Sequence, residues 1–129
     1  LGGLMAFQPA SKATINFNNI DHVQDDSVAG LEWDKLEYNF GKITAGEKVE
    51  TVFRVTNNRK DTLEIENVAG SCGCLVPKWT KGRILPGGAG EVTVRFNSEG
   101  KWGKQTRSAA VYTNRGLFTL YLYAIIDEN

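Results

Sequence analysis

The segment Val49-Glu-Thr-Val-Phe-Arg-Val55 decides the fold class of this chain. Its odd-numbered side chains are apolar or Thr, and its even-numbered side chains are charged apart from Val52. Because successive side chains of a β-strand point to opposite faces, this period of two predicts a strand with one buried face. Gly46 before the segment and Asn57-Asn58 after it are turn residues, and they limit the length of the strand.

The same alternation recurs along residues 36–126, with turn chemistry such as Pro86-Gly87-Gly88 between the segments. No long segment has the apolar spacing of a helix. The sequence therefore predicts an all-β domain over residues 31–129, an immunoglobulin-like β-sandwich of about seven strands. The side chains predicted to face inward are Leu36, Tyr38, Phe40, Val49, Thr51, Phe53, Val55, Leu63, Ile65, Val92, Val94, Phe96, Ala109, Val111, Thr113, Phe118, Leu120, Leu122 and Ala124.

Residues 1–30 differ from the rest of the chain and are expected to form an extended N-terminal arm. The apolar start followed by Ser11-Lys-Ala13 resembles the end of a secretory signal, so residues 1–13 are interpreted either as a signal-peptide remnant or as a retained anchor. A polar, acidic linker completes the arm, which spans on the order of 100 Å when fully extended. One extra strand is predicted in the arm, with Ala13, Ile15 and Phe17 on one face.

Length and charge limit the classes of protein to which the chain can belong. The 129 residues suit one domain plus the arm, and the 41% apolar content is enough for an ordinary core. Fifteen basic and fifteen acidic side chains cancel, so no net field attracts nucleic acid or an anionic membrane. No apolar run approaches the ~20 residues of a membrane span. We therefore expect no nucleic-acid partner and no membrane span.

The only two cysteines lie in Cys72-Gly-Cys74, and three interpretations of them stay open. In a regular strand, residues two apart have their β-carbons farther apart than the ~3.8 Å of a disulfide. Gly73 relaxes the backbone, which allows a structural pair, buried or disulfide-linked, or a strained, redox-active disulfide. Two thiolates also suit a soft ion such as Cu(I), but structural zinc needs about four ligands and the chain adds only Met5 and His22. We predict no cofactor and no catalytic site, with His22 solvated.

A series of short motifs runs from Leu36 to Ile126. The motifs are Phe40-Gly41, Gly46-Glu47, Phe53 to Asn57, Leu63 to Ile65, Ser71 to Cys74, Pro77, Trp79, Pro86-Gly87, Val92 to Phe96, Gly103 and Thr113-Asn114. Their order resembles a bacterial domain family of unknown function with a Cys-Gly-Cys-Thr signature, common in Bacteroidota envelope and secreted proteins. The resemblance implies a Hydin-type or major-sperm-protein-like immunoglobulin fold and a binding or structural module, not an enzyme. Leu75 departs from the family, which usually has Thr or Ser there.

The last alternating segment carries candidate interface residues. If its even-numbered side chains from Phe118 to Ala124 face the core, then Tyr121, Tyr123 and Ile125 face outward. Aromatic residues are enriched in interfaces, although cross-strand packing on a solvated sheet explains the same pattern. Trp79 and Trp102 are candidates for a carbohydrate platform or for loop anchors.

Three functions follow from these features, and we favour the first. A structural subunit of the cell envelope or surface would donate its arm strand to a sheet edge of the next copy, and this head-to-tail contact makes filaments. Ala13, Ile15 and Phe17 would be the inserted face, with Leu4, Met5 and Phe7 as a second anchor. The second is a monomeric secreted or periplasmic module that binds protein or glycan. The third is a thiol redox or Cu(I) protein that uses Cys72 and Cys74.

Overall fold

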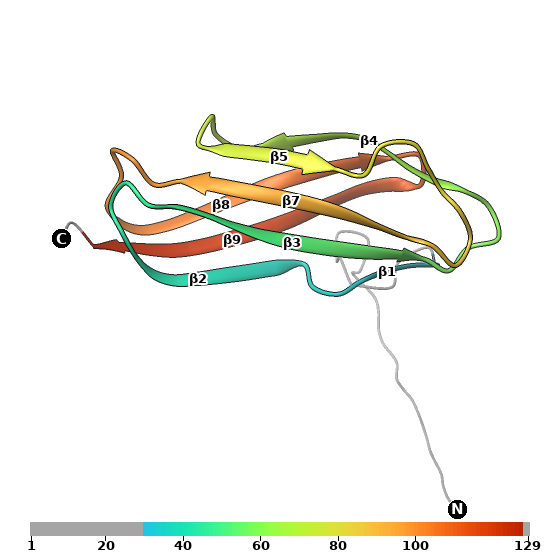
Figure 1. Cartoon of the computed structure of the whole chain (residues 1–129), viewed down its shortest axis with the longest axis horizontal. Coiled ribbons are helices and arrows are strands. Elements are labelled where there is room, and N and C mark those ends of the chain that lie inside the picture. Colours follow the sequence, from blue (N-terminus) through green and yellow to red (C-terminus); the bar gives the residue numbers. More distant parts are fainter. Residues whose placement is uncertain (1–29, 128–129) are drawn as a thin grey trace, which may run out of the picture.

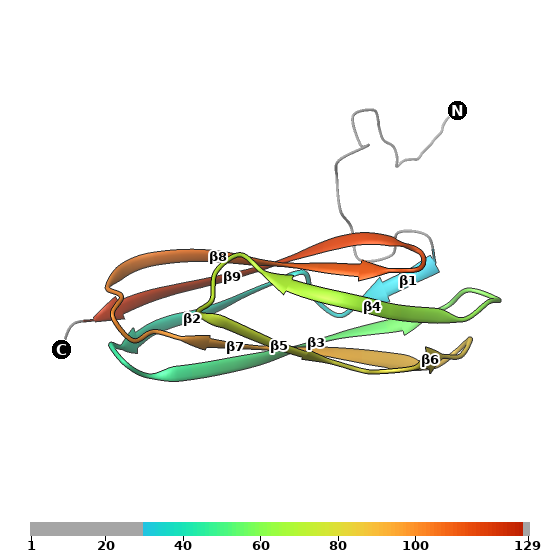
Figure 2. The ribbon, with the colours of Figure 1, turned by 90° about the horizontal axis from the view of Figure 1, so that it is seen from above.

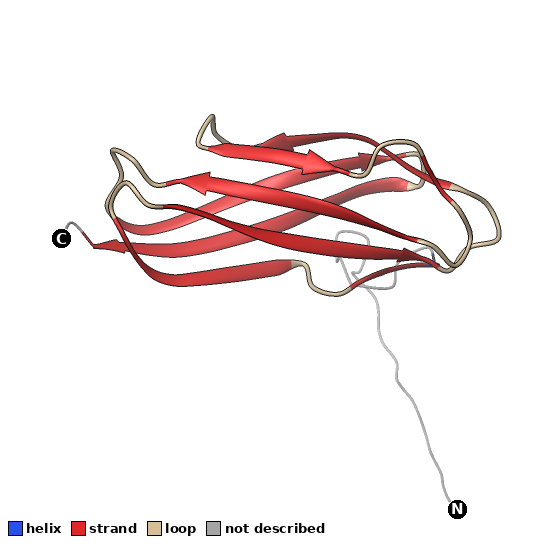
Figure 3. Ribbon diagram, in the orientation of Figure 1, coloured by secondary structure: helices blue, strands red, loops and turns tan. Residues whose placement is uncertain are grey.

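Nine strands packed as two facing sheets make up the computed structural model, which describes residues 30–127 (Figure 1). The four-stranded sheet has the order β1-β3-β7-β5, and the five-stranded sheet has the order β2-β9-β8-β4-β6. The two layers are seen edge-on in Figure 2, and the described residues contain no α-helix (Figure 3). The strands are β1 (Leu31–Trp33), β2 (Glu37–Thr44), β3 (Lys48–Asn57), β4 (Leu63–Gly70), β5 (Leu75–Trp79), β6 (Arg83–Ile84), β7 (Ala89–Asn97), β8 (Gly103–Thr113) and β9 (Gly116–Asp127).

The core lies between the two sheets and is built from the alternating residues of their inner faces. Phe53, Val92, Val111 and Leu120 are fully buried, which confirms the predicted period of two and the β-sandwich. Tyr38 is the clearest departure, because 39% of it is exposed although it was predicted to face inward. It lies on β2, an edge strand whose inner face the opposite sheet covers only in part.

Three strands were not predictable from the sequence, two because they are short and one because it contains a proline. β1 and β6 have three and two residues, too few to display a period of two. β5 contains Pro77, which argues against a strand in a sequence read alone. Its position removes the conflict. Asn97 N–H donates to the Cys74 carbonyl, so by alternation Pro77 turns its missing N–H to the free edge, where no ladder bond is lost.

β1 and β2 form one edge segment that changes sheets. β1 is antiparallel to β3, whereas β2 is parallel to β9 in the other sheet. A β-bulge interrupts β2 between Asn39 and Lys42, where Gly41 has a φ of 75° and its N–H donates to Asn39 Oδ1 at 2.8 Å. Because the chain leaves the four-stranded sheet after Trp33, β1 covers only one end of β3.

Candidate functional site

Half of the outer edge of β3 has no strand partner among the described residues. β3 pairs with β7 from Lys48 to Thr56 but with β1 only from Val55 to Asn57. The main-chain groups of Arg54 face the β1 side, since its carbonyl accepts from Asp34 N–H at 2.9 Å. By alternation the main-chain groups of Lys48, Glu50 and Val52 face the same side. We call these three residues the β3 open edge.

Aromatic side chains of β2 lie near the β3 open edge, because the Lys35 ammonium that binds the Val52 carbonyl is 5.5 Å from the Tyr38 ring centroid. Tyr38 and Phe40 pack edge to face with ring centroids 5.1 Å apart, and Phe40 and Val49 are only half-buried against the core. A strand added to this edge would place alternate side chains over these rings. The edge therefore offers main-chain hydrogen bonds together with apolar surface, the two components of binding by strand addition.

Lys35 occupies part of the β3 open edge. Its Nζ donates to the Val52 carbonyl at 2.6 Å and lies 5.5 Å from the ring centroid of Tyr38 and 5.2 Å from that of Phe53. Asp34 Oδ2 is 3.8 Å from the same ammonium. Lys35 therefore occupies one of the carbonyls that an added strand would use. Its charge also disfavours unselective strand pairing at this edge.

The other open edges of the described sandwich are interrupted. β5 carries Pro77 at its free edge, β2 has its bulge, and β4 has a register shift between Ile65 and Asn67. β1 and β6 are too short to template a strand. The β3 open edge thus differs from the others in being long enough to pair and in having neither a bulge nor a proline.

A second candidate surface is the outer face of the five-stranded sheet. Tyr121 and Ile125 are 40% and 45% exposed, and Tyr123 is half-buried, so all three lie on the outward face expected from the sequence. Tyr112 and its cross-strand partner Leu117 extend the row. Sequence reasoning missed these two, although Leu117 continues the odd-numbered series of β9. We call the five residues the aromatic stripe.

Glu37 contacts the aromatic stripe from the neighbouring strand β2. Tyr123 Oη donates to Glu37 Oε1 at 3.2 Å. Desolvation by its neighbours, and next the hydrogen bond and charge of Glu37, raise the pKa of Tyr123 above its ordinary value. The hydrogen bond that the phenol donates links β9 to the edge strand β2.

The two cysteines form a disulfide, which is one of the arrangements that the sequence left open. Their Cα atoms are 5.1 Å apart, within the usual range for a disulfide. Cys72-Gly-Cys74 is a turn and not a regular strand, so the spacing argument against closure does not apply. Neither sulfur is a thiolate in this state. The described residues contain no cluster of three or more His, Cys, Asp or Glu side chains suited to a metal ion.

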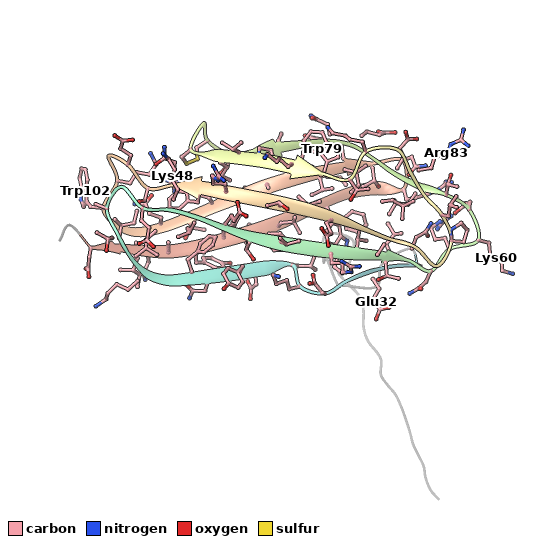
Figure 4. The ribbon with its side chains drawn as sticks, in the orientation of Figure 1. Glu32, Lys48, Lys60, Trp79, Arg83 and Trp102 are labelled. Carbon is pink, nitrogen blue, oxygen red and sulfur yellow. A yellow bond between two sulfur atoms is a disulfide. The ribbon has the colours of Figure 1, made fainter. Side chains whose placement is uncertain are left out.

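Trp79 and Trp102 do not form a common platform. Trp79 lies at the end of β5 beneath the Lys81 ammonium, which is 3.7 Å from its ring centroid. Trp102 lies at one end of the sandwich, whereas Trp79 lies near its middle (Figure 4), and the grooves that the two side chains line share no residue. The two rings therefore do not form a common carbohydrate platform, one of the two interpretations of the sequence, and the loop-anchor interpretation stays a prediction.

The arm itself lies outside the described residues. Within residues 30–127, no helix has the length and hydropathy to cross a membrane. The predicted residues that the structure leaves undescribed are Leu4, Met5, Phe7, Ala13, Ile15, Phe17 and His22.

Comparisons with known proteins support the fold and the family. A family model described as a protein of unknown function, DUF1573, matches residues 31–125, which confirms the expected membership of a family of unknown function. The Cys-Gly-Cys-Thr signature and the Hydin-type likeness stay predictions. No curated protein matches the chain.

Solved structures share the sandwich at low identity. A protein of unknown function from Porphyromonas gingivalis W83 has a TM-score of 0.64 at 17% identity, covering 74% of this chain and 46% of that one. A PapD-like domain of human CEP192 has a TM-score of 0.62 at 11% identity, covering 91% and 98%. A family 123 glycoside hydrolase from Clostridium perfringens has a TM-score of 0.63 at 8% identity, covering 73% and 23%. The chain spans less than half the length of the Porphyromonas and Clostridium proteins, and these likenesses establish the fold alone.

Proposed function

From the premise that this chain belongs to the DUF1573 family, whose function is unknown, we propose that it is a non-enzymatic assembly subunit of the bacterial cell envelope or surface. The observation that carries the proposal is the β3 open edge, whose main-chain groups have no strand partner among the described residues and which lies near the partly exposed Tyr38 ring of β2. Strand addition to such an edge gains affinity from main-chain hydrogen bonds and specificity from alternate side chains.

The donor is residues 13–17 of a second copy. In an added strand Ala13, Ile15 and Phe17 would share one face, so they would cover Tyr38 and Phe40 while the polar residues between them face solvent. Leu4, Met5 and Phe7 supply a second apolar anchor. A contact between an arm and an edge is heterologous, so repeated copies form an open filament.

The same arm also has the length to fold back on its own sandwich. Residues 18–29 span at most about 40 Å when extended. The ten residues of β3 span about 34 Å, which is less than the extended length of residues 18–29. The linker is therefore long enough to follow the whole of β3. The mass of the particle in solution distinguishes the two arrangements, because pairing within one chain leaves a monomer.

Light scattering and negative-stain microscopy of the full chain and of a chain lacking residues 1–29 test the proposal. We expect oligomers or fibres of the full chain and a folded monomer after the deletion. Two variants form a matched pair, Ile15→Asp on the inserted face and Asn16→Asp on the opposite face, and only the first should abolish assembly. A full chain that is monomeric, or a shortened chain that still polymerises, contradicts the proposal.

Two further parts of the proposal concern compartment and alternatives. The disulfide supports a secreted, surface or periplasmic location, because disulfides persist in oxidising compartments. A monomeric module that binds a protein or glycan is the second candidate, and the exposure of the aromatic stripe favours it. Its test is loss of binding in a Tyr121→Ser, Ile125→Ser double variant that stays folded. A thiol redox or Cu(I) role comes third, since it requires the reduced pair.

A further inference from the structure

A groove with unpartnered positive charge lies at the end of the sandwich where β7 turns into β8. The groove has a volume of about 230 Å³ and is lined by Gly100, Lys101, Trp102, Gln105 and Arg107. Trp102 is 66% exposed, more than any other large apolar side chain of the described residues (Figure 4). The groove therefore presents a flat aromatic ring to solvent next to two cations.

The polar side chains of this groove are held in place by one another. Gln105 and Arg107 occupy inward positions of β8, since Ala109 and Val111 of the same series are buried. Gln105 Nε2 donates to the Trp102 carbonyl at 2.8 Å, and Gln105 Oε1 accepts from Arg107 Nη2. The Gln105 amide thus links the turn that carries Trp102 to the guanidinium.

Two more contacts complete the placement of Arg107. Its Nη1 donates to the Thr106 carbonyl at 2.9 Å, and its guanidinium lies 6.0 Å from the Phe96 ring centroid. Side chains that are fixed before a ligand arrives lose less conformational entropy on binding. Arg107 is therefore held in place as in an anion-binding site, unlike a surface arginine whose side chain has only water as its partner.

Neither cation of the groove has a carboxylate partner among the described residues. Arg54, Arg95 and Arg115 each pair with an acidic side chain, whereas no ion pair includes Lys101 or Arg107. The groove consequently attracts a ligand that brings its own negative charge. Arg binds a carboxylate in a planar, two-point manner, and Lys adds a point charge.

We propose that this groove binds a carboxylate-bearing sugar, a uronic acid residue of a polysaccharide. One face of the sugar ring would stack on the Trp102 indole while its carboxylate meets Arg107 and Lys101. Single-stranded nucleic acid also stacks on aromatic rings, but it needs a basic path along its backbone, and this chain has a net charge of zero. The proposal stands independently of strand donation, because the β3 open edge contributes no residue to the groove.

Titration of the full chain with trigalacturonate at low salt tests the proposal, with calorimetry as the readout and maltotriose as the neutral control. We expect saturable binding of the uronate and binding of maltotriose that is at least about 10-fold weaker, the scale of one charged hydrogen bond. Arg107→Gln and Trp102→Ala should each weaken uronate binding by about 10-fold or more. Lys104→Gln, on the outward face of the same strand, should not change it and controls for net charge.

Several outcomes would overturn the proposal. These are absence of uronate binding, equal binding of maltotriose, and unchanged binding in Arg107→Gln. Tighter binding of an oligothymidylate than of the uronate would assign the groove to nucleic acid instead. Because Trp102 is largely exposed, the Trp102→Ala variant keeps the test decisive if the half-buried Arg107 proves necessary for folding.

Discussion

The Lys35 ammonium donates to the Val52 carbonyl at 2.6 Å. Lys35 lies between β1 and β2, where the chain passes from one sheet to the other. The two residues are 17 positions apart, and their contact lies at the boundary between the part of β3 that β1 covers and the part that it leaves open. The ammonium also lies 5.5 Å from the Tyr38 ring centroid and 5.2 Å from that of Phe53, so it contacts residues of both β2 and β3. Lys35 therefore limits the strands that can enter.

Replacing Lys35 by Met should increase self-association of the chain that lacks residues 1–29. The substitution removes the charge that disfavours unselective pairing and leaves the Val52 carbonyl to other donors. Size-exclusion chromatography over a range of concentrations measures the effect. Lys60→Met, which adds the same side chain at an exposed loop position, is the control and should remain monomeric. Equal behaviour of the two variants would show that Lys35 does not guard the edge.

Replacing Asn57 by Ala should lower the free energy of unfolding by about 2–4 kcal/mol, as measured by urea denaturation. Asn57 is fully buried, and its Nδ2 donates to the carbonyls of Asp61 at 2.9 Å and Ile84 at 3.0 Å. Its Oδ1 accepts from Arg59 N–H at 2.9 Å, so Ala would strand three main-chain groups.

Asn58→Ala is the matched control, because Asn58 is exposed and its side chain donates to Glu32 Oε1 at 3.0 Å. We expect this control to cost less than about 1 kcal/mol. Similar losses in the two variants would contradict the assignment of Asn57 as the buried anchor of this loop.

Removing the disulfide should leave the sandwich folded. The ring closed by Cys72 and Cys74 contains a single intervening residue, so the chain-entropy model assigns it only about 1–2 kcal/mol. Urea denaturation of the Cys72→Ser, Cys74→Ser variant checks this value, and the wild-type chain in dithiothreitol should behave alike. A reduced chain without a cooperative transition would mean that the disulfide holds far more of the fold than its ring size indicates.

Tyr123 should ionise above pH 10, as followed by absorbance at 295 nm against a Tyr123→Phe reference. Its pKa is raised chiefly by desolvation and then by the hydrogen bond to Glu37. A pKa raised on folding contributes stability that is present below the ordinary value of 10.0 and is lost as the pH rises through the folded value. Glu37→Gln removes the negative charge and should lower the pKa of Tyr123. An unchanged titration in Glu37→Gln would leave desolvation as the only cause.

Much of the fold was predictable because local alternation is visible in one dimension. The inner faces of β3, β7, β8 and β9 follow from the period of two, and the outward placement of Tyr121 and Ile125 follows from the same rule. β1 and β6 were not predictable, since two or three residues carry no period. A common platform of Trp79 and Trp102, one of the two interpretations of these residues, is not formed, because the sequence does not report how far apart two residues lie in the sandwich.

By itself the sequence determined the inner faces of β3, β7, β8 and β9, because the direction of a side chain in a strand follows the alternation of neighbours. It also indicated the turns, since Gly and Asn adopt backbone conformations that other residues avoid. Only the tertiary structure decided which edge is open, because that depends on where β1 leaves β3 and on the pairing of residues far apart in the chain. The same holds for the groove at Trp102. Only the folded structure places Trp102 beside Arg107, where Gln105 is hydrogen-bonded to both residues.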